Sequence, residues 1–157
     1  MECKCRGFIN NERMPGKYTG FGEDISPELT LESLPENTVS LAIIMDDLDV
    51  PFLPVFTHWI IWNMPPVTTI PEGIPKGKEI SHPFKAVQGN AWGKHVYRGP
   101  KQPLLFRTAH RYRFTVYAID TVLDLSPEEN RAGLIKAMTG HVIEKAEITG
   151  IYDPRVD

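Results

Sequence analysis

Two histidines each open an apolar segment that has the pattern of a buried strand. His58 lies at the start of residues 57–64 and His110 at the start of residues 110–120, and aromatic residues flank both. An imidazole can donate, accept or carry a proton near neutral pH, so two of them at neighbouring strand ends could bind or activate a small polar ligand. A single histidine at a strand end is more often a structural residue, so the hypothesis depends on the groups beside it.

Three carboxylates follow another apolar segment, residues 39–46. Asp46, Asp47 and Asp49 lie within four positions of one another. Carboxylates this close repel each other unless a cation, a metal ion or an imidazolium lies among them. A solvated turn is the alternative interpretation.

The loop 97–103 could bind an anion. Glycine at position 99 would let the backbone approach a ligand closely, and free backbone N–H groups beside Arg98 and Lys101 could form an anion-binding nest. Pro100 and Pro103 stiffen the path of this loop. A Gly-Pro turn is common in proteins, so this pattern alone is weak evidence for an anion-binding loop.

The elements that would position these groups are mostly strands. Segments 39–46 and 57–64 are apolar on both faces, which predicts central strands of a sheet, and 110–120 alternates as a third strand. Residues 65–103 are rich in Pro, Gly and aromatics and predict a packed functional loop. Alternation in the second strand predicts one face with His58, Ile60, Trp62 and Met64 and another with Trp59, Ile61 and Asn63.

One helix is expected near the C-terminus. Ser126 would be its N-cap, Pro127 its first residue and Gly140 its C-terminal cap, so the helix would span 127–139. The following segment, 142–152, predicts a turn or short helix and then an edge strand. The expected apolar stripe of the helix consists of Ala132, Ile135 and Met138.

Composition limits the classes of protein. A chain of 157 residues predicts a single domain, 1–157, and a net charge of −3 argues against a nucleic-acid binder that works by bulk charge. The sequence shows neither a membrane-spanning segment nor a signal peptide, so it predicts a cytoplasmic protein. Cys3 and Cys5 could supply two metal ligands but are more simply bystander thiols, and neither a metal nor a cofactor is expected.

Taken together, the motifs resemble the phosphatidylethanolamine-binding protein (PEBP), or Raf kinase inhibitor protein, family, and especially its YbhB/YbcL-like branch. The matching motifs include S-P-E-L at 26–29, D-D-L-D-V-P at 46–51, T-H-W at 57–59, N-A-W-G at 90–93, Y-R-G-P at 97–100, H-R-Y-R-F at 110–114 and G-H-V at 140–142. Gln102 departs from the family pattern, which has a proline there.

The resemblance implies a mainly β fold, a β-sandwich of antiparallel-rich sheets with one or two helices near the C-terminus. It also implies a small pocket for an anion or phosphate headgroup. The implied ligand-binding residues are Asp47, His58, Gly99, Pro100, His110 and Tyr112, with Asp49 and Tyr97 just behind them.

Three functions compete. The first is a non-enzymatic protein that binds a small phosphorylated or other anionic ligand and regulates a protein partner, as kinase inhibitors of this family do. The second is a hydrolase that uses an Asp–His pair, with Asp47, Asp49, His58 and His110 as residues of a metal-assisted version. A purely structural module, the third, would leave these residues without a role. The ligand, the partner and the choice between monomer and homodimer stay open.

Overall fold

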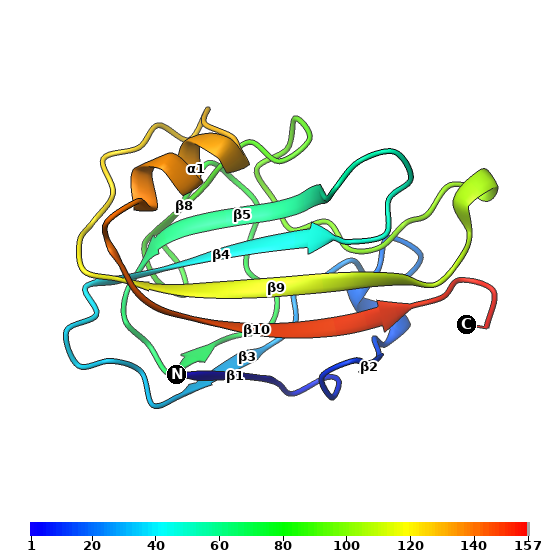
Figure 1. The fold of residues 1–157 in the computed structure, drawn as a ribbon, viewed down its shortest axis with the longest axis horizontal. Helices are drawn as coiled ribbons and strands as arrows, with labels where there is room; N and C mark the ends of the chain where they lie inside the picture. Colours follow the sequence, from blue (N-terminus) through cyan, green and yellow to red (C-terminus); the bar gives the residue numbers. More distant parts are fainter. Residues whose placement is uncertain (157) are drawn as a thin grey trace.

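Two β-sheets and one short helix form the layers of the computed structural model, which describes residues 1–156 (Figure 1). The smaller sheet has the order β1 (Glu2–Cys5), β3 (Leu29–Glu32), β6 (Thr69–Ile70). The larger sheet runs in the order β2 (Glu12–Arg13), β10 (Val142–Tyr152), β9 (His110–Ile119), β4 (Ser40–Asp47), β5 (Phe56–Met64), β8 (Ala86–Gln88), β7 (Glu79–Ile80). Helix α1 (Arg131–Met138) and the single 3₁₀ turns η1 (Gly16–Tyr18) and η2 (Leu104–Phe106) complete the elements. The mainly β fold class is confirmed.

The larger sheet is apolar on both faces, as the composition of its central strands predicts. Leu41 and Ile43 of β4 face the smaller sheet, whereas Ala42 and Ile44 face α1. All eight residues of β4 are buried. Such two-sided burial explains why β4, β5 and β9 can be identified from sequence within one residue at most boundaries.

Two bulges in β5, one towards each end, make the predicted faces of this strand wrong at its ends. Ile60 and Trp62 face α1 and Trp59 and Ile61 face the smaller sheet, as expected. Met64, however, packs with the Trp59 face. Its register against β4 shifts between Leu41 and Ile43, where β5 carries an extra residue. Asn63 adopts the left-handed conformation there, with φ 57°, so alternation breaks at its position.

The helix begins later than its sequence suggests. Asn130 is the N-cap, and its side chain accepts a hydrogen bond from the Gly133 amide at 3.2 Å. Ser126 instead caps a turn by accepting from the amide of Glu128 at 3.2 Å. The predicted start at Pro127 is therefore wrong, because two capping residues compete within five positions and the second one wins. The predicted end is confirmed, since Gly140 follows with φ 84°.

A different helical face is buried as a consequence. Leu134 and Met138, four residues apart, contact the larger sheet. Ala132 is exposed and Ile135 is 37% exposed, so the predicted stripe is correct only at Met138.

The C-terminal segment is a strand over its whole length. β10 pairs antiparallel with β9 from Val142 to Tyr152, so the segment 142–152 itself contains no turn or short helix. It lies next to the edge, where the two-residue strand β2 pairs with it in parallel. The sharp turn at Gly140 leaves no room for a second helical turn.

The N-terminal segment is ordered and forms the outer layer. Cys3 lies in β1 and is buried, and burial raises its pKa to about 12, so this thiol is protonated at neutral pH. No group of three or more His, Cys, Asp or Glu residues among residues 1–156 could hold a metal ion.

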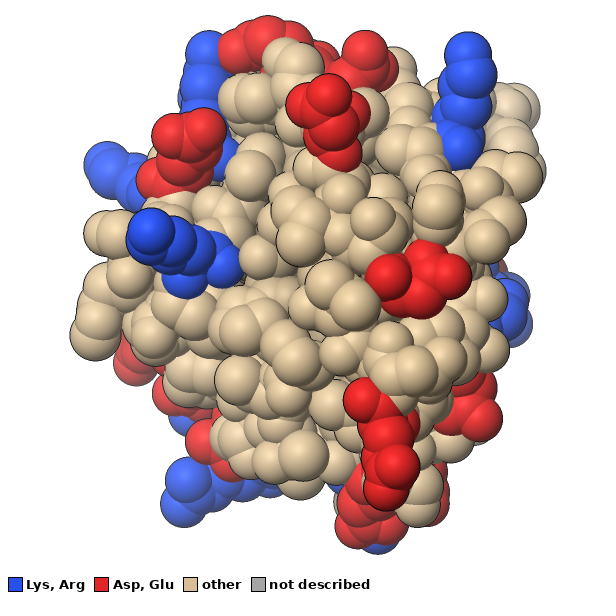
Figure 2. Space-filling view, turned by 90° about the vertical axis from the view of Figure 1, so that its left-hand side faces the viewer, with Lys and Arg blue, Asp and Glu red and all other residues tan. Residues whose placement is uncertain are grey.

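Figure 2 views the molecule from the left-hand end of Figure 1. Asp and Glu side chains, together with Lys and Arg side chains, stand around a broad uncharged surface at this end. Within the described residues, no helix is long and apolar enough to span a membrane.

Candidate functional site

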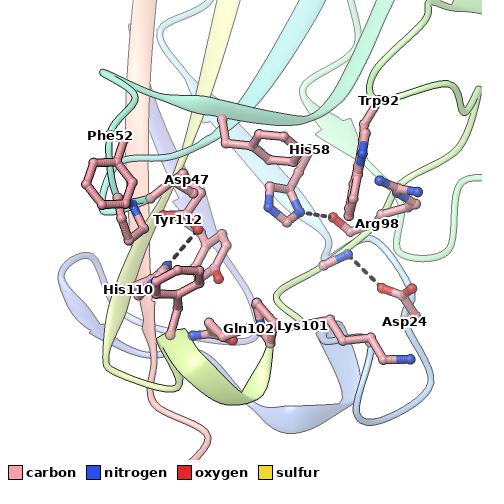
Figure 3. Close-up of a pocket in the computed structure, with 17 residues that line it drawn as sticks. Asp24, Asp47, Phe52, His58, Trp92, Arg98, Lys101, Gln102, His110 and Tyr112 are labelled. Atoms are coloured by element: carbon pink, nitrogen blue, oxygen red, sulfur yellow. Dashed lines mark hydrogen bonds and ion pairs between the residues drawn. The ribbon is translucent and has the colours of Figure 1, made fainter.

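A cavity of about 500 Å³ opens at the opposite end of the larger sheet, where β4 ends and β5 and β9 begin (Figure 3). Its walls come from three strand ends and from three loops, around residues 20–24, 50–52 and 98–106. The polar residues that line it are Asp24, Asp47, His58, Arg98, Lys101, Gln102, His110 and Tyr112. The rest of the lining consists of the aromatic side chains of Phe52, Phe56, Trp92 and Phe106, together with Gly20, Val50, Pro51, Gly99 and Pro103.

The three clustered carboxylates each have a different partner. Asp46 turns away from the cavity and accepts from Arg131 of α1 at 3.0 Å. Asp47 faces the cavity. Asp49 binds Arg111 through both carboxylate oxygens, at 2.9 and 3.0 Å. The repulsion expected from the sequence is thus relieved by an imidazole and two guanidinium groups.

Asp47 and His110 form a buried pair on adjacent strands. The distance between Asp47 Oδ2 and His110 Nδ1 is 2.8 Å, and both side chains are 4% exposed. Asp47 Oδ1 accepts from the amide of Asp49 at 2.9 Å, so both carboxylate oxygens are held in place. Because a carboxylate accepts, the Nδ1 atom of His110 carries a proton and its second nitrogen, Nε2, is left for the cavity.

His58 is held in the same way by a backbone carbonyl. Its Nδ1 donates to the carbonyl oxygen of Arg98 at 2.8 Å, which again leaves Nε2 without a hydrogen-bond partner among the described residues. Burial lowers the pKa of His58, and the Arg98 carbonyl and the charge of Asp47 oppose this shift only partly. The ring is therefore neutral at pH 7 in the free protein, with an Nε2 lone pair.

A bulge places His58 in the cavity. Met45 of β4 pairs with Trp59 and Asp46 pairs with Thr57, so His58 is an extra residue with no partner on β4. With regular pairing, His58 would lie opposite Asp46 on the α1 side. The extra residue turns it instead to the face that carries Asp47 and Tyr112.

Tyr112 is the third polar group of the cavity floor. Its ring is perpendicular to that of His58, at 5.4 Å between centroids. Burial, together with the negative charge of Asp47, raises the pKa of Tyr112 well above its usual value. The phenol therefore remains protonated over the physiological range and can donate a hydrogen bond.

Gly99 lines the cavity, but the close approach of the segment 18–24 is the reason why this position needs a glycine. A Cβ atom at this position would lie 1.9 Å from the carbonyl oxygen of Tyr18. Its amide donates to Asp24 Oδ1 at 2.7 Å. The glycine thus permits close approach of the segment 18–24, and its N–H is not the free nest donor expected from the sequence.

The other residues that the family resemblance implies do not line the cavity. Pro100 accepts through its carbonyl from the Gly20 amide at 2.8 Å, and the Tyr97 hydroxyl donates to the Tyr18 carbonyl at 2.7 Å. Asp49 is engaged with Arg111. The structure therefore brings together Asp47, His58, Gly99, His110 and Tyr112 at the cavity, and Pro100, Tyr97 and Asp49 are absent from its lining residues.

Sequence reasoning missed several lining residues. Asp24 lies in a turn-rich segment with no apolar pattern to mark it. Trp92 lies in the long loop, with a left-handed backbone of φ 52°, and the guanidinium of Arg98 stacks 3.9 Å from its ring centroid. The sequence signals for Trp92 were the density of aromatics in the loop and its place in the N-A-W-G motif at 90–93.

The family model for phosphatidylethanolamine-binding proteins matches residues 5–153 of this chain. The chain belongs to the PEBP family.

Two archaeal relatives support this assignment. The chain is 51% identical to a UPF0098 protein of Pyrococcus horikoshii over 147 residues, which cover 93% of this chain and 73% of that one. It is 42% identical to a UPF0098 protein of Methanothermobacter thermautotrophicus over 154 residues, 97% of this chain and 98% of that one.

Solved structures of PEBP-family proteins have the same fold. The PEBP homologue CT736 of Chlamydia trachomatis superposes with a TM-score of 0.84 at 34% identity, over 97% of this chain and 96% of that one. E. coli YbcL, described as a new member of the mammalian PEBP family, superposes with a TM-score of 0.85 at 28% identity, over 97% of each chain.

Gln102 stands where the PEBP motif has a proline. Its side chain fixes the loop through hydrogen bonds, whereas a proline would stiffen it through its ring. Its side-chain nitrogen donates to the carbonyl of Thr108 at 3.2 Å and to that of Tyr152 at 3.1 Å. The side chain is thereby tied to the segment before β9 and to the end of β10. These bonds fix the wall 99–103 against the larger sheet.

Replacement of Gln102 is expected to destabilise the fold. Gln102→Leu removes the hydrogen bonds to the carbonyls of Thr108 and Tyr152 and should lower the free energy of unfolding by about 1–3 kcal/mol. Gln102→Glu has the same shape but directs an oxygen at both carbonyls, so it should cost at least as much. Urea denaturation measures both variants. Wild-type stability of Gln102→Glu would show that these bonds do not hold the wall.

Proposed function

We propose that this PEBP-family chain is a non-catalytic binding protein whose cavity takes a small phosphorylated or otherwise anionic ligand. The observation that carries the proposal is the pair of imidazoles on the cavity wall. His58 and His110 each have Nδ1 fixed by a neighbour, at 2.8 Å in both cases, and each leaves Nε2 for a ligand.

Anion binding would proceed with proton uptake. A neutral imidazole whose Nδ1 is protonated offers only a lone pair at Nε2, which repels an anion. Protonation converts Nε2 into a charged donor, and Asp47 stabilises the resulting imidazolium of His110. The Tyr112 hydroxyl would add a neutral donor, and Lys101 would add a positive charge at the wall.

Asp47 would act on the ligand through His110. Both of its oxygens are already occupied, by His110 and by the Asp49 amide. A carboxylate held in this way orients and charges the imidazole without meeting the anion itself. Asp24, which also lines the cavity, is held by the Gly99 amide.

Titration of the protein with inorganic phosphate tests the proposal. His110→Gln removes a charged donor and should weaken phosphate binding at least tenfold, as is typical of hydrogen bonds to charged groups. His141→Gln is the matched control, because His141 forms the same kind of pair, 2.8 Å from Asp120, on the exposed surface away from the cavity. Equal losses in both variants, or no phosphate binding by the wild type, would overturn the proposal.

A hydrolase is the second candidate, because an Asp–His pair at a cavity can act as a general base. Tyr112 is the only residue with a hydroxyl or thiol among those that line the cavity, and its raised pKa makes it a poor nucleophile. Asp49, required by a metal-assisted version, is held by Arg111 outside the lining. Turnover of phosphoesters, esters or peptides that is lost in Asp47→Asn, with or without divalent metals, would favour the hydrolase.

A further inference from the structure

The guanidinium of Arg98 lies at the cavity with one edge unused. Its Nε and Nη2 atoms are buried and have no hydrogen-bond partner among residues 1–156, and Arg98 is one of the residues that line the cavity. These two nitrogens form the edge that binds a carboxylate or a phosphate through parallel hydrogen bonds. A buried charged donor without an acceptor is costly, so this edge needs an explanation.

Other arginines of the chain use the same edge to bind a carboxylate. Nε and Nη2 of Arg111 donate to Asp49 at 3.0 and 2.9 Å. The same atoms of Arg131 donate to Asp46 at 3.2 and 3.0 Å. Burial lowers the pKa of Arg98, as expected for a cation that has lost contact with water. The edge of Arg98 thus has the chemistry of an anion site, but within the described part of the chain no side chain fills it.

The indole ring of Trp92 covers this guanidinium. The guanidinium carbon of Arg98 lies 3.9 Å from the ring centroid. Phe56 contacts the same indole edge-on, with 4.9 Å between centroids. In Figure 3 the indole stands between the imidazole of His58 and the guanidinium of Arg98. The cation–π contact offsets part of the cost of burying the charge, but it also separates Arg98 from any anion at the imidazoles.

The cover is an exposed side chain on a rigid turn. Ala91 and Lys94 exchange two backbone hydrogen bonds, at 3.0 and 3.1 Å, and the Asn90 side chain accepts from the Gly93 amide at 2.8 Å. The Trp92 side chain itself is 65% exposed. Exposed side chains change rotamer within nanoseconds, whereas a hydrogen-bonded turn keeps its shape. A ligand can therefore displace the indole without opening the turn.

We propose that Arg98 is a second anion subsite, covered by Trp92 in the free protein, and that the cavity takes ligands with two acidic groups. This inference rests on the proposed anion binding by His58 and His110. One acidic group binds the imidazoles, and the other replaces the indole at the Nε–Nη2 edge of Arg98. The two subsites belong to neighbouring parts of the wall, because the Arg98 carbonyl accepts from His58 Nδ1 at 2.8 Å.

A single small anion would leave one of the two subsites empty. Because the indole of Trp92 lies between them, a lone phosphate at the imidazoles does not reach Arg98. Diphosphates and phosphorylated carboxylic acids share the required chemistry, which is two acidic groups on a short linker. In both classes the second group offers a pair of oxygens to the guanidinium edge.

Calorimetric titration with sulfonates, whose charge is fixed, tests the proposal. Ethanesulfonate carries one anionic group, whereas methane-, ethane- and propanedisulfonate carry two at increasing separation. At about pH 6, where the imidazoles can take up a proton, we expect at least one disulfonate to bind about tenfold more tightly than ethanesulfonate. Titration with pyrophosphate and with phosphoglycolate then shows which of the two ligand classes fits the spacing.

Arg98→Gln should remove the advantage of the disulfonate. The variant keeps the backbone carbonyl that holds His58, so ethanesulfonate should bind within about threefold of the wild type. Arg113→Gln is the matched control and should keep the advantage. It removes the same charge, and Arg113 Nε is also buried, but Arg113 is not among the residues that line the cavity.

Trp92→Gly tests the role of the cover. Glycine adopts the left-handed backbone of this position, φ 52°, without strain. Since the cation–π contact no longer has to be broken, the disulfonate should bind about threefold more tightly than to the wild type. In the wild type the disulfonate should change the tryptophan emission much more than ethanesulfonate does. This change should be absent in Trp92→Gly, because Trp59 and Trp62 are buried.

The outcomes separate this inference from the proposed function. Disulfonates and pyrophosphate that bind no more tightly than ethanesulfonate and phosphate would overturn the Arg98 subsite and leave the imidazole site in place. Absence of binding by all of these anions would overturn both proposals. An advantage that is lost equally in Arg113→Gln, or weaker disulfonate binding by Trp92→Gly, would also overturn the subsite.

Discussion

Gly99→Ala is expected to destabilise the protein by about 3 kcal/mol or more, because the new Cβ has no space. It would lie 1.9 Å from the Tyr18 carbonyl oxygen and 2.9 Å from Thr19 Cα, and both are backbone atoms that cannot rotate away. The two segments must separate, which also strains the hydrogen bonds from the Gly99 amide to Asp24 and from the Gly20 amide to the Pro100 carbonyl. Urea denaturation of the purified variant measures the loss.

Gly93→Ala is the matched control for this experiment. Gly93 has φ 74° and open space around its would-be Cβ, so alanine there should cost only about 1 kcal/mol of backbone strain. A Gly99→Ala variant that is too unstable to purify while Gly93→Ala folds agrees with the expectation. Equal stability of the two variants would show that the contact between segments 97–100 and 18–24 is loose.

A ligand of fixed charge should bind about tenfold more weakly at pH 8 than at pH 6, since its binding requires an imidazolium. Methanesulfonate is suitable because its charge does not change over this range. Burial lowers the pKa of His58, and a bound anion raises it again. Binding therefore takes up a proton, and affinity is lost as pH rises through the pKa of the bound state. Titration calorimetry at constant ionic strength gives the profile.

Substitution of either imidazole should flatten that profile. His58→Gln and His110→Gln keep a hydrogen-bonding side chain but cannot gain a proton. Tyr112, which also lines the cavity, stays protonated between pH 6 and 8 because burial raises its pKa. The measured enthalpy should also depend on the ionisation enthalpy of the buffer. A wild-type profile without slope would mean that neither histidine responds to the ligand.

The central strands of the larger sheet could be predicted from the sequence because they are buried on both faces. β4 and β9 bury alternate residues against two different layers, so their apolar patterns are long and regular. The start of α1 could not be settled, since Ser126 and Asn130 are both good caps and packing of Leu134 against the sheet decides between them. Short strands such as β7 and β8 gave no signal because two or three residues do not make a pattern.

The candidate site could be predicted only in part from the sequence, for a different reason. Asp47, His58 and His110 are titratable and lie at strand ends, which marks them in the sequence. Contacts between distant segments leave no such mark: Gly99 was interpreted as a ligand-facing residue, although it permits contact with Tyr18, 81 positions earlier. Asp24 reaches the cavity through the same contact.

The extra residue at His58 in β5 also limits how far this protein can be stabilised without loss of its cavity wall. Stabilising designs often regularise strands, and deletion of the unpaired position at His58 would give an ordinary ladder between β4 and β5. The straighter sheet would then have no imidazole on this cavity wall. We expect the most stable sequences for this backbone to be those least able to hold an anion. A relative that is one residue shorter at this point in β5 should keep the fold and lack the histidine's part of the pocket.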